Sequence, residues 1–285
     1  MEVFIECIPC FMKQAIEAAR LATHDLEIQQ KAIKLVLEKL SNTSWGPSSP
    51  HLGRLVHNLI KEATGNPDPY KSLKDHSTKI ALKLADKLKK EMFSCKDPFE
   101  FSVKLSLAGN TIDFGARPGE KIDIEKEIKD IMNIQIDTAT LKFFKNCIKR
   151  SQKILFLTDN AGEIVFDKFL IEEIGPEKVV CVVKSKPIIN DATLEDARIS
   201  SLTELVKVIE NGNDYPGTVI DECSDEFRSL FWDSDLIIAK GQGNYETLNE
   251  VEAPIFFLFK VKCPVVARLT NREVGDVVVL SSFLL

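Results

Sequence analysis

The sequence lacks the features that mark membrane-bound, secreted and fibrous proteins. None of its apolar runs approaches the ~20 residues that a membrane-spanning helix needs. Its first residues, Met1 to Cys7, are acidic and show no basic segment followed by a long apolar stretch, so no secretory signal is visible. Glycine and proline are scarce, at 13 and 12 of 285 residues, which excludes a fibrous or linker-rich chain. We therefore expect a folded, cytoplasmic protein without a membrane partner.

An excess of positive charge is also missing. Lysine and arginine total 37 and aspartate and glutamate total 43, so the formal net charge is −6. Proteins that bind nucleic acids normally carry a basic stripe or patch, so we expect no nucleic-acid partner. Hydrophobic residues make up 44% of the chain and charged residues 28%, which are ordinary values for a globular protein with a sizeable core. The sequence does not indicate an oligomeric state.

The seven cysteines do not form a disulfide framework, because their number is odd and they are scattered along the chain. Only Cys7 and Cys10 lie close together, in Cys7-Ile8-Pro9-Cys10. This pair has three interpretations. It is half of a zinc site whose other ligands are distant, a redox pair of the kind found at a helix start after a strand, or a structural element that lines a substrate pocket.

The pattern of apolar residues divides the chain into two parts. Residues 1–100 show the 3.6-residue spacing of amphipathic helices, one of which ends at Gly65-Asn66-Pro67, a C-cap glycine followed by a helix-breaking proline. From about residue 151, short continuous apolar runs alternate with helical segments, which is typical of strands buried on both faces of a sheet. These runs are 154–157, 179–183, 236–239, 255–259 and 277–280.

This pattern predicts an α/β fold. We expect an all-α N-terminal domain at 1–100, followed at 101–285 by a three-layer α/β/α domain with a mostly parallel sheet. The boundary falls somewhere within 100–150, a region whose domain is not evident from its pattern. Periodicity does not determine the order of the strands.

Polar residues follow three of the predicted strands, and the carboxyl ends of strands are where open α/β sheets bind ligands. They are Asp159, Asn160 and Glu163 after the first, Asp191 after the second, and Lys240, Gly241 and Gly243 after the third. Two carboxylates and an amide supply hard oxygen ligands for a divalent cation. Lysine and the glycine amides suit an anion, and the set as a whole suits a phosphoryl group. Each segment alone could also be a structural turn, with Asp159 as a helix cap.

These segments resemble the signatures of the metal-dependent damage-control phosphatases. The resemblance covers 159–163, 189–193 and 240–246, extends forward through 108–115 and 64–70, and begins at Cys7 and Cys10, which resemble the mainly prokaryotic CxxC-bearing subfamily. It implies a helical part joined to an α/β/α part. It also implies hydrolysis of phosphate monoesters of small metabolites, such as sugar phosphates or damaged metabolites, with Mn²⁺, Co²⁺, Ni²⁺ or Mg²⁺.

Residue by residue, the resemblance implies that Asp159, Asn160 and Asp191 bind the metal and that Lys240 holds the substrate phosphate. Further candidates for substrate binding are Gly241, Gly243, Asn244, Asn110, Asp113 and Glu163. Asn110 and Asp113 either support the metal ligands or form a structural turn. Glu163 either acts as a general base or orients water, or it simply stabilises the start of a helix.

The nucleophile has two alternatives. Phosphatases of the haloacid dehalogenase type also place an aspartate after a first strand, but they carry a second aspartate two positions later, where this chain has Ala161. We therefore favour attack by metal-activated water, with Asp159 as a ligand. Two other kinds of function stay open: a protein that binds a phosphorylated metabolite without turnover, and a thiol-redox protein that depends on Cys7 and Cys10.

Overall fold

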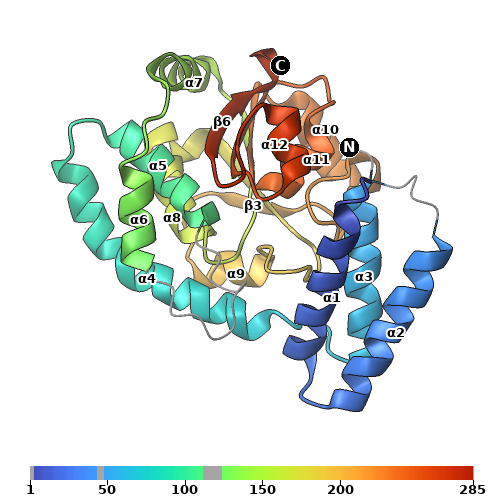
Figure 1. Cartoon of the computed structure of the whole chain (residues 1–285). Coiled ribbons are helices and arrows are strands. Elements are labelled where there is room, and N and C mark those ends of the chain that lie inside the picture. The colour runs from blue at the N-terminus through green and yellow to red at the C-terminus, as the bar shows by residue number, and fades with distance from the viewer. Residues whose placement is uncertain (1–2, 44–47, 112–123, 285) are drawn as a thin grey trace.

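The computed structural model describes residues 3–43, 48–111 and 124–284. Its centre is a six-stranded sheet in the order β3-β2-β1-β4-β5-β6 (Figure 1). The strands are β1 (Ile154–Leu157), β2 (Val179–Val183), β3 (Lys207–Glu210), β4 (Leu236–Lys240), β5 (Ile255–Lys260) and β6 (Val277–Ser281). Strands β1 to β5 run parallel, and β6 pairs antiparallel with β5. The mostly parallel sheet expected from the sequence is therefore confirmed.

One strand, β3, has no counterpart among the apolar runs of the sequence. Ile209 is its one buried residue, while Lys207 and Glu210 are exposed. Since β3 lies at the edge of the sheet, its outer side meets solvent and it needs no continuous apolar run.

The strand order creates a crevice beside β1. From β1 the chain continues to β2 and β3 on one side, and then crosses back to β4 on the other. At such a reversal the two connections leave in opposite directions, so the carboxyl ends of the neighbouring strands border an open space. The segments that follow β1 and β4 both carry predicted site residues, and the sheet places them next to each other.

Helices cover both faces of the sheet. Successive strand residues point to opposite faces: Phe156 and Ile238 belong to one core, and Leu155 and Ile237 to the other. The first core is covered by α4 (Lys71–Ser94), α5 (Pro98–Thr111), α6 (Ile124–Met132), α7 (Thr138–Arg150), α8 (Ile164–Ile174) and α9 (Leu194–Ile199). The second is covered by α10 (Asp225–Asp233), α11 (Gln242–Leu248) and α12 (Pro264–Thr270). In the described part of the chain no helix has the length and apolar character needed to cross a membrane.

The N-terminal helices form a separate bundle. Helices α1 (Cys7–Ala22), α2 (Leu26–Asn42) and α3 (Ser49–Thr64) share a core that includes Ala15, Val36 and Ile60, and Figure 1 shows them beside the sheet. Helix α4 contributes to both cores, because its Leu73 packs against the bundle while its Leu88 and Met92 lie in the core of the sheet. The hydrophobic cores thus divide within α4, whereas the sequence pattern places the division at 100–150. A domain at 1–100 that folds by itself stays a prediction.

Polar contacts fasten the bundle to loops of the sheet. Arg54 on α3 donates to Asp214 at 2.5 Å, and its guanidinium lies 4.5 Å from the centre of the Tyr215 ring. Lys61, two helical turns further along, donates to the carbonyl oxygen of Pro187 at 2.5 Å. These contacts bring α3 and its partner α1 over the carboxyl edge of the sheet.

The buried His57 on α3 predicts a pH dependence of stability. Burial, helped by the charge of Lys61, lowers the pKa of His57 from 6.5 to about 3. Between these values the unfolded chain binds a proton that the folded protein does not, so stability falls as the pH drops. We expect this single group to remove about 1.4 kcal/mol of unfolding free energy per pH unit across that range. The measurement is urea denaturation of wild type and His57→Gln from pH 7 to pH 4.

The matched control is His24→Gln, because His24 is exposed. The His57 variant should show a shallower decline in unfolding free energy with acid than the control does. Equal slopes in the two variants would contradict the assignment.

Candidate functional site

A pocket of about 370 Å³ lies at the carboxyl edge of the sheet, between the sheet and the N-terminal bundle. Its lining includes Asp159, Asn160 and Asp191 from the sheet side, and Cys7, Cys10 and Gln14 from α1. The three predicted metal ligands are therefore brought together in one cavity. The wall opposite them comes from a part of the chain about 150 residues away in sequence.

Backbone pairing holds the two ligand-bearing loops together. Asn160 and Asp191 form an antiparallel bridge, and the amide of Ala192 donates to the carbonyl oxygen of Asp159 at 2.7 Å. Ile189, just before this bridge, has a positive φ of 45°, which is unusual for a β-branched residue. Such strain is typical of turns that the surrounding structure enforces at functional sites.

Two side-chain amides join the carboxylates of Asp159 and Glu163. Asn110 donates to Asp159 at 2.7 Å and to Glu163 at 3.0 Å, and Asn160 donates to both at 2.8 Å. Asn110 thus lies beside the predicted ligands, as one of its two interpretations expects, while Asp113 lies outside the described residues. Because both N–H groups of Asn160 point to carboxylates, its amide oxygen is the atom left to meet a cation.

The carboxyl groups of the predicted ligands Asp159 and Asp191 have raised pKa values. Desolvation at the pocket floor raises the pKa of Asp159 to about 8, and the neighbouring charges of Glu163 and Asp191 add to the rise. Desolvation also raises the pKa of Asp191 to about 6, even though Lys184 lies 3.6 Å away and opposes it. Near neutral pH Asp159 therefore keeps its proton unless a cation replaces it, whereas Asp191 is mostly ionised.

The donor set fits a hard divalent cation. The described residues contain no group of three or more His, Cys, Asp or Glu side chains arranged to hold a metal ion. The predicted set differs from such a group, because it has two carboxylates and one amide oxygen. Oxygen ligands of this kind suit Mg²⁺ and Mn²⁺, which often keep water in their remaining positions.

Lys240 lies beneath the pocket floor and not in its lining. Its side chain is fully buried and donates to Glu163, to Asp167 at 2.7 Å and to the carbonyl oxygen of Ser106 at 3.0 Å. Burial lowers the pKa of Lys240, but the charges of Asp167 and Glu163 outweigh it and hold the pKa above its ordinary value. A direct contact between Lys240 and a phosphate stays a prediction, and this placement does not favour it.

The residues after Lys240 have different surroundings. Gly241 has a φ of 81°, and a Cβ there would overlap the carboxylate of Asp159. Gly243 lines the pocket. Asn244 is buried, and its amide donates to the carbonyl oxygen of Lys240 at 2.7 Å, so it supports the turn from below. A role for Gly241 and Asn244 in substrate binding stays a prediction.

Several residues that line the pocket were not predicted for the site, among them Lys262 and Cys263. These two follow β5, whose carboxyl end lies at the same edge as those of β1 and β4. The apolar run of β5 is visible in the sequence, and a position directly after such a run is the signal that indicates both residues. The charge of Lys262 opposes the rise that desolvation causes in the pKa of Asp159 and Asp191. Lys262 and Lys13 are two exposed lysines at the pocket rim, which also carries the exposed Glu6.

The CxxC motif forms the first turn of α1 and lines the pocket together with Cys263. Burial raises the pKa of Cys7 and of Cys10, so both stay protonated at neutral pH. The described residues place no third and fourth ligand for a zinc site around them. Of the three interpretations, the structure agrees best with a pocket wall.

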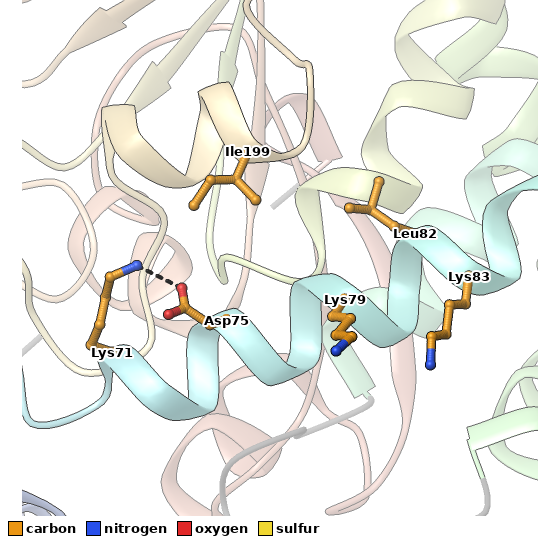
Figure 2. A pocket seen from close by; sticks show the side chains of 6 residues that line it. All are labelled: Lys71, Asp75, Lys79, Leu82, Lys83 and Ile199. Carbon is orange, nitrogen blue, oxygen red and sulfur yellow. Dashed lines mark hydrogen bonds and ion pairs between the residues drawn. The ribbon is translucent and has the colours of Figure 1, made fainter.

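A second hollow of about 550 Å³ lies between α4 and α9 (Figure 2). Its lining residues are Lys71, Asp75, Lys79, Leu82, Lys83 and Ile199. Lys71 already pairs with Asp75 at 2.6 Å and with Glu195 at 3.1 Å. None of the polar residues predicted for the site lines this hollow, so the candidate site is the pocket at the sheet edge.

The chain is similar to known proteins over nearly its whole length. Residues 3–278 match the family described as the damage-control phosphatase ARMT1-like domain. The chain is 42% identical to an uncharacterized protein of Methanocaldococcus jannaschii, covering 96% of this chain and 94% of that protein. It is 38% identical to a damage-control phosphatase of Pyrococcus horikoshii, with 98% and 97% covered, and 34% identical to one of Archaeoglobus fulgidus, with 98% of each covered.

A solved structure shares this fold. The crystal structure of a DUF89 family protein from Pyrococcus horikoshii superimposes with a TM-score of 0.90 at 37% sequence identity. The superposition covers 99% of both chains, so the fold is shared from end to end.

The tight approach of Gly241 to Asp159 predicts that Gly241→Ala weakens cation binding. The added Cβ would push the Asp159 carboxylate from its place, in addition to straining the backbone. We expect a loss of Mn²⁺ affinity, measured by isothermal titration calorimetry. The control is Gly65→Ala, because Gly65 also has a positive φ of 68° but nothing lies within 4 Å of its Cβ position. Equal Mn²⁺ affinities in the two variants would contradict the prediction.

Proposed function

The chain belongs to the ARMT1-like damage-control phosphatase family, and from this membership we propose that it is a metal-dependent phosphatase for phosphate monoesters of small metabolites. Sugar phosphates and damaged phosphometabolites are the expected substrates. The observation that carries the proposal is the convergence of Asp159, Asn160 and Asp191 in a single pocket.

The size and lining of the pocket support a small substrate. A volume of about 370 Å³ lies at the lower end of the range for small-molecule sites, so it suits a phosphorylated metabolite better than a polymer. Gln14 and Asn190 offer hydrogen bonds to hydroxyl groups, and Lys13 and Lys262 offer positive charge to a phosphate.

Asp159, Asn160 and Asp191 would hold the divalent cation, which supplies charge neutralisation and activation of water when it is bound. Around it, the amide of Asn110 helps to orient Asp159, and Lys262 offsets negative charge at the pocket rim. Glu163 is fully buried behind Asp159, so orienting the neighbouring amides suits it better than taking a proton from water.

We favour water as the nucleophile over Asp159. One oxygen of Asp159 accepts hydrogen bonds from both Asn110 and Asn160, which stabilises the carboxylate in one orientation. A carboxylate fixed in this way is suited to a ligand, and position 161 lacks the second aspartate of the aspartyl-phosphate enzymes.

Removal of metal should abolish turnover. We expect a chelated protein to release no phosphate from a panel of phosphorylated metabolites, and Mn²⁺, Co²⁺, Ni²⁺ or Mg²⁺ to restore release. Asp191→Asn should lose activity while keeping its fold, whereas Asp225→Asn, at an exposed surface carboxylate, should not. Undiminished turnover in a verified metal-free preparation would contradict the metal requirement. Ligand binding without turnover under all metals would favour a binding protein instead.

The cysteines should matter less than the aspartates. Neither thiol is needed for hydrolysis by water, so Cys7→Ser combined with Cys10→Ser should reduce phosphate release less than Asp159→Ala does. The comparison uses kcat and KM on the best substrate of the panel. A well-folded double-serine protein as inactive as the Asp159 variant would favour a thiol-dependent function.

A further inference from the structure

We infer that Lys240 and Asp167 are a buried positioning pair that orients the metal-binding side chains, and that Lys240 does not contact the substrate phosphate. The inference rests on the proposed function, because it concerns the same site. Asp167 lies on α8, four residues after Glu163, so both carboxylates face β4 from one side of the helix.

The contacts of Lys240 leave it no donor for a substrate. An ammonium group has three N–H donors. The Nζ atom of Lys240 meets three acceptors: Glu163, Asp167 and the carbonyl oxygen of Ser106. All of this lies in the protein interior, where breaking one bond of a buried ion pair is costly. A phosphate would have to reach the lysine through the pocket floor and displace a carboxylate from it.

From Lys240 the contacts lead directly to the predicted ligands. One oxygen of Glu163 accepts from Lys240, and the other accepts from Asn110 at 3.0 Å and from Asn160 at 2.8 Å. The same two amides donate to Asp159 at 2.7 and 2.8 Å. Lys240 therefore fixes Glu163, Glu163 fixes two amides, and the amides fix one oxygen of Asp159. The other oxygen of Asp159 is thereby held in a defined direction.

Two further bonds make this arrangement rigid. The hydroxyl of Ser106 donates to Asp167 at 2.6 Å, on the oxygen that also accepts from Lys240. The backbone amide of Lys260 donates to the side-chain oxygen of Asn110 at 3.1 Å, which sets the direction of the Asn110 amide. The network thus joins α5, α8, β4 and the end of β5, and it ends at Asp159 and Asn160.

The test is Mn²⁺ affinity, measured by isothermal titration calorimetry without substrate. Removing a partner that orients a ligand typically weakens metal binding by about 10- to 100-fold, and we expect a change of that order in Lys240→Met. Asp167→Asn keeps the shape and the lysine, so we expect a smaller weakening, by about 10-fold at most. At saturating Mn²⁺, the KM of both variants for a phosphate ester should stay within about threefold of wild type, because no phosphate contact is lost.

The matched control is Lys104→Met. Lys104 is also a buried lysine, pairing with Glu100 at 2.8 Å and with the carbonyl oxygen of Met132 at 3.2 Å, but it does not touch the network. We expect its Mn²⁺ affinity to equal that of wild type, which separates orientation of the site from a general loss of a buried ion pair. Circular dichroism verifies folding, and Asp167→Asn carries the test if Lys240→Met does not fold.

Two results would overturn the inference. Wild-type Mn²⁺ affinity with a raised KM in Lys240→Met would mean that Lys240 contacts the phosphate, as the sequence resemblance implies. Wild-type Mn²⁺ affinity and wild-type KM in Lys240→Met and Asp167→Asn would mean that the pair only stabilises the fold. A wild-type protein that binds no divalent cation would instead overturn the proposed function, which is a different and separately visible outcome.

Discussion

Repulsion between carboxylates is the constraint on which the site depends. Asp159, Glu163, Asp167 and Asp191 gather around the ends of β1 and β2, and three of them are buried. Negatively charged carboxylates that are shielded from solvent repel each other, which favours their protonated forms. Lys240 sits between two of them, and amide groups of asparagine join another pair. The arrangement stabilises the folded protein only as a complete set, because each donor serves more than one acceptor.

Much of this site could be predicted from the sequence. Continuous apolar runs predict buried parallel strands, and the carboxyl ends of parallel strands meet at one edge. That reasoning alone brings Asp159 and Asp191 together, although they are 32 positions apart in the chain. The strand order cannot be predicted from the apolar pattern, and neither can β3, which is half exposed and has no continuous apolar run. The docking of α3 depends on Arg54 and Asp214, a pair whose partnership exists only in the folded protein.

The direction of the Lys240 side chain follows from its place in β4. Side chains alternate between the two faces of a sheet. Ile238 faces the core beneath α5 and α8, so Lys240, two positions later, faces the same way. The apolar run of 236–239 predicts that Lys240 follows a strand, but Lys240 is the last residue of β4, so the alternation still applies to it and points it into the interior. Lys262 lies beyond the end of β5, where the alternation no longer applies, and its side chain lines the pocket.

The pocket is built from two parts of the chain with separate hydrophobic cores, so side chains on its two walls can change independently during evolution. The floor is held by dense polar contacts, so a substitution there disturbs several side chains at once. The facing wall from α1 and α3 contributes side chains that rest on a helical bundle of their own. Exchanges on that wall can therefore alter which metabolite fits while the reacting groups stay in place. Under the proposed function, the residues assigned to the chemistry and the wall that faces them therefore lie on different segments of the chain.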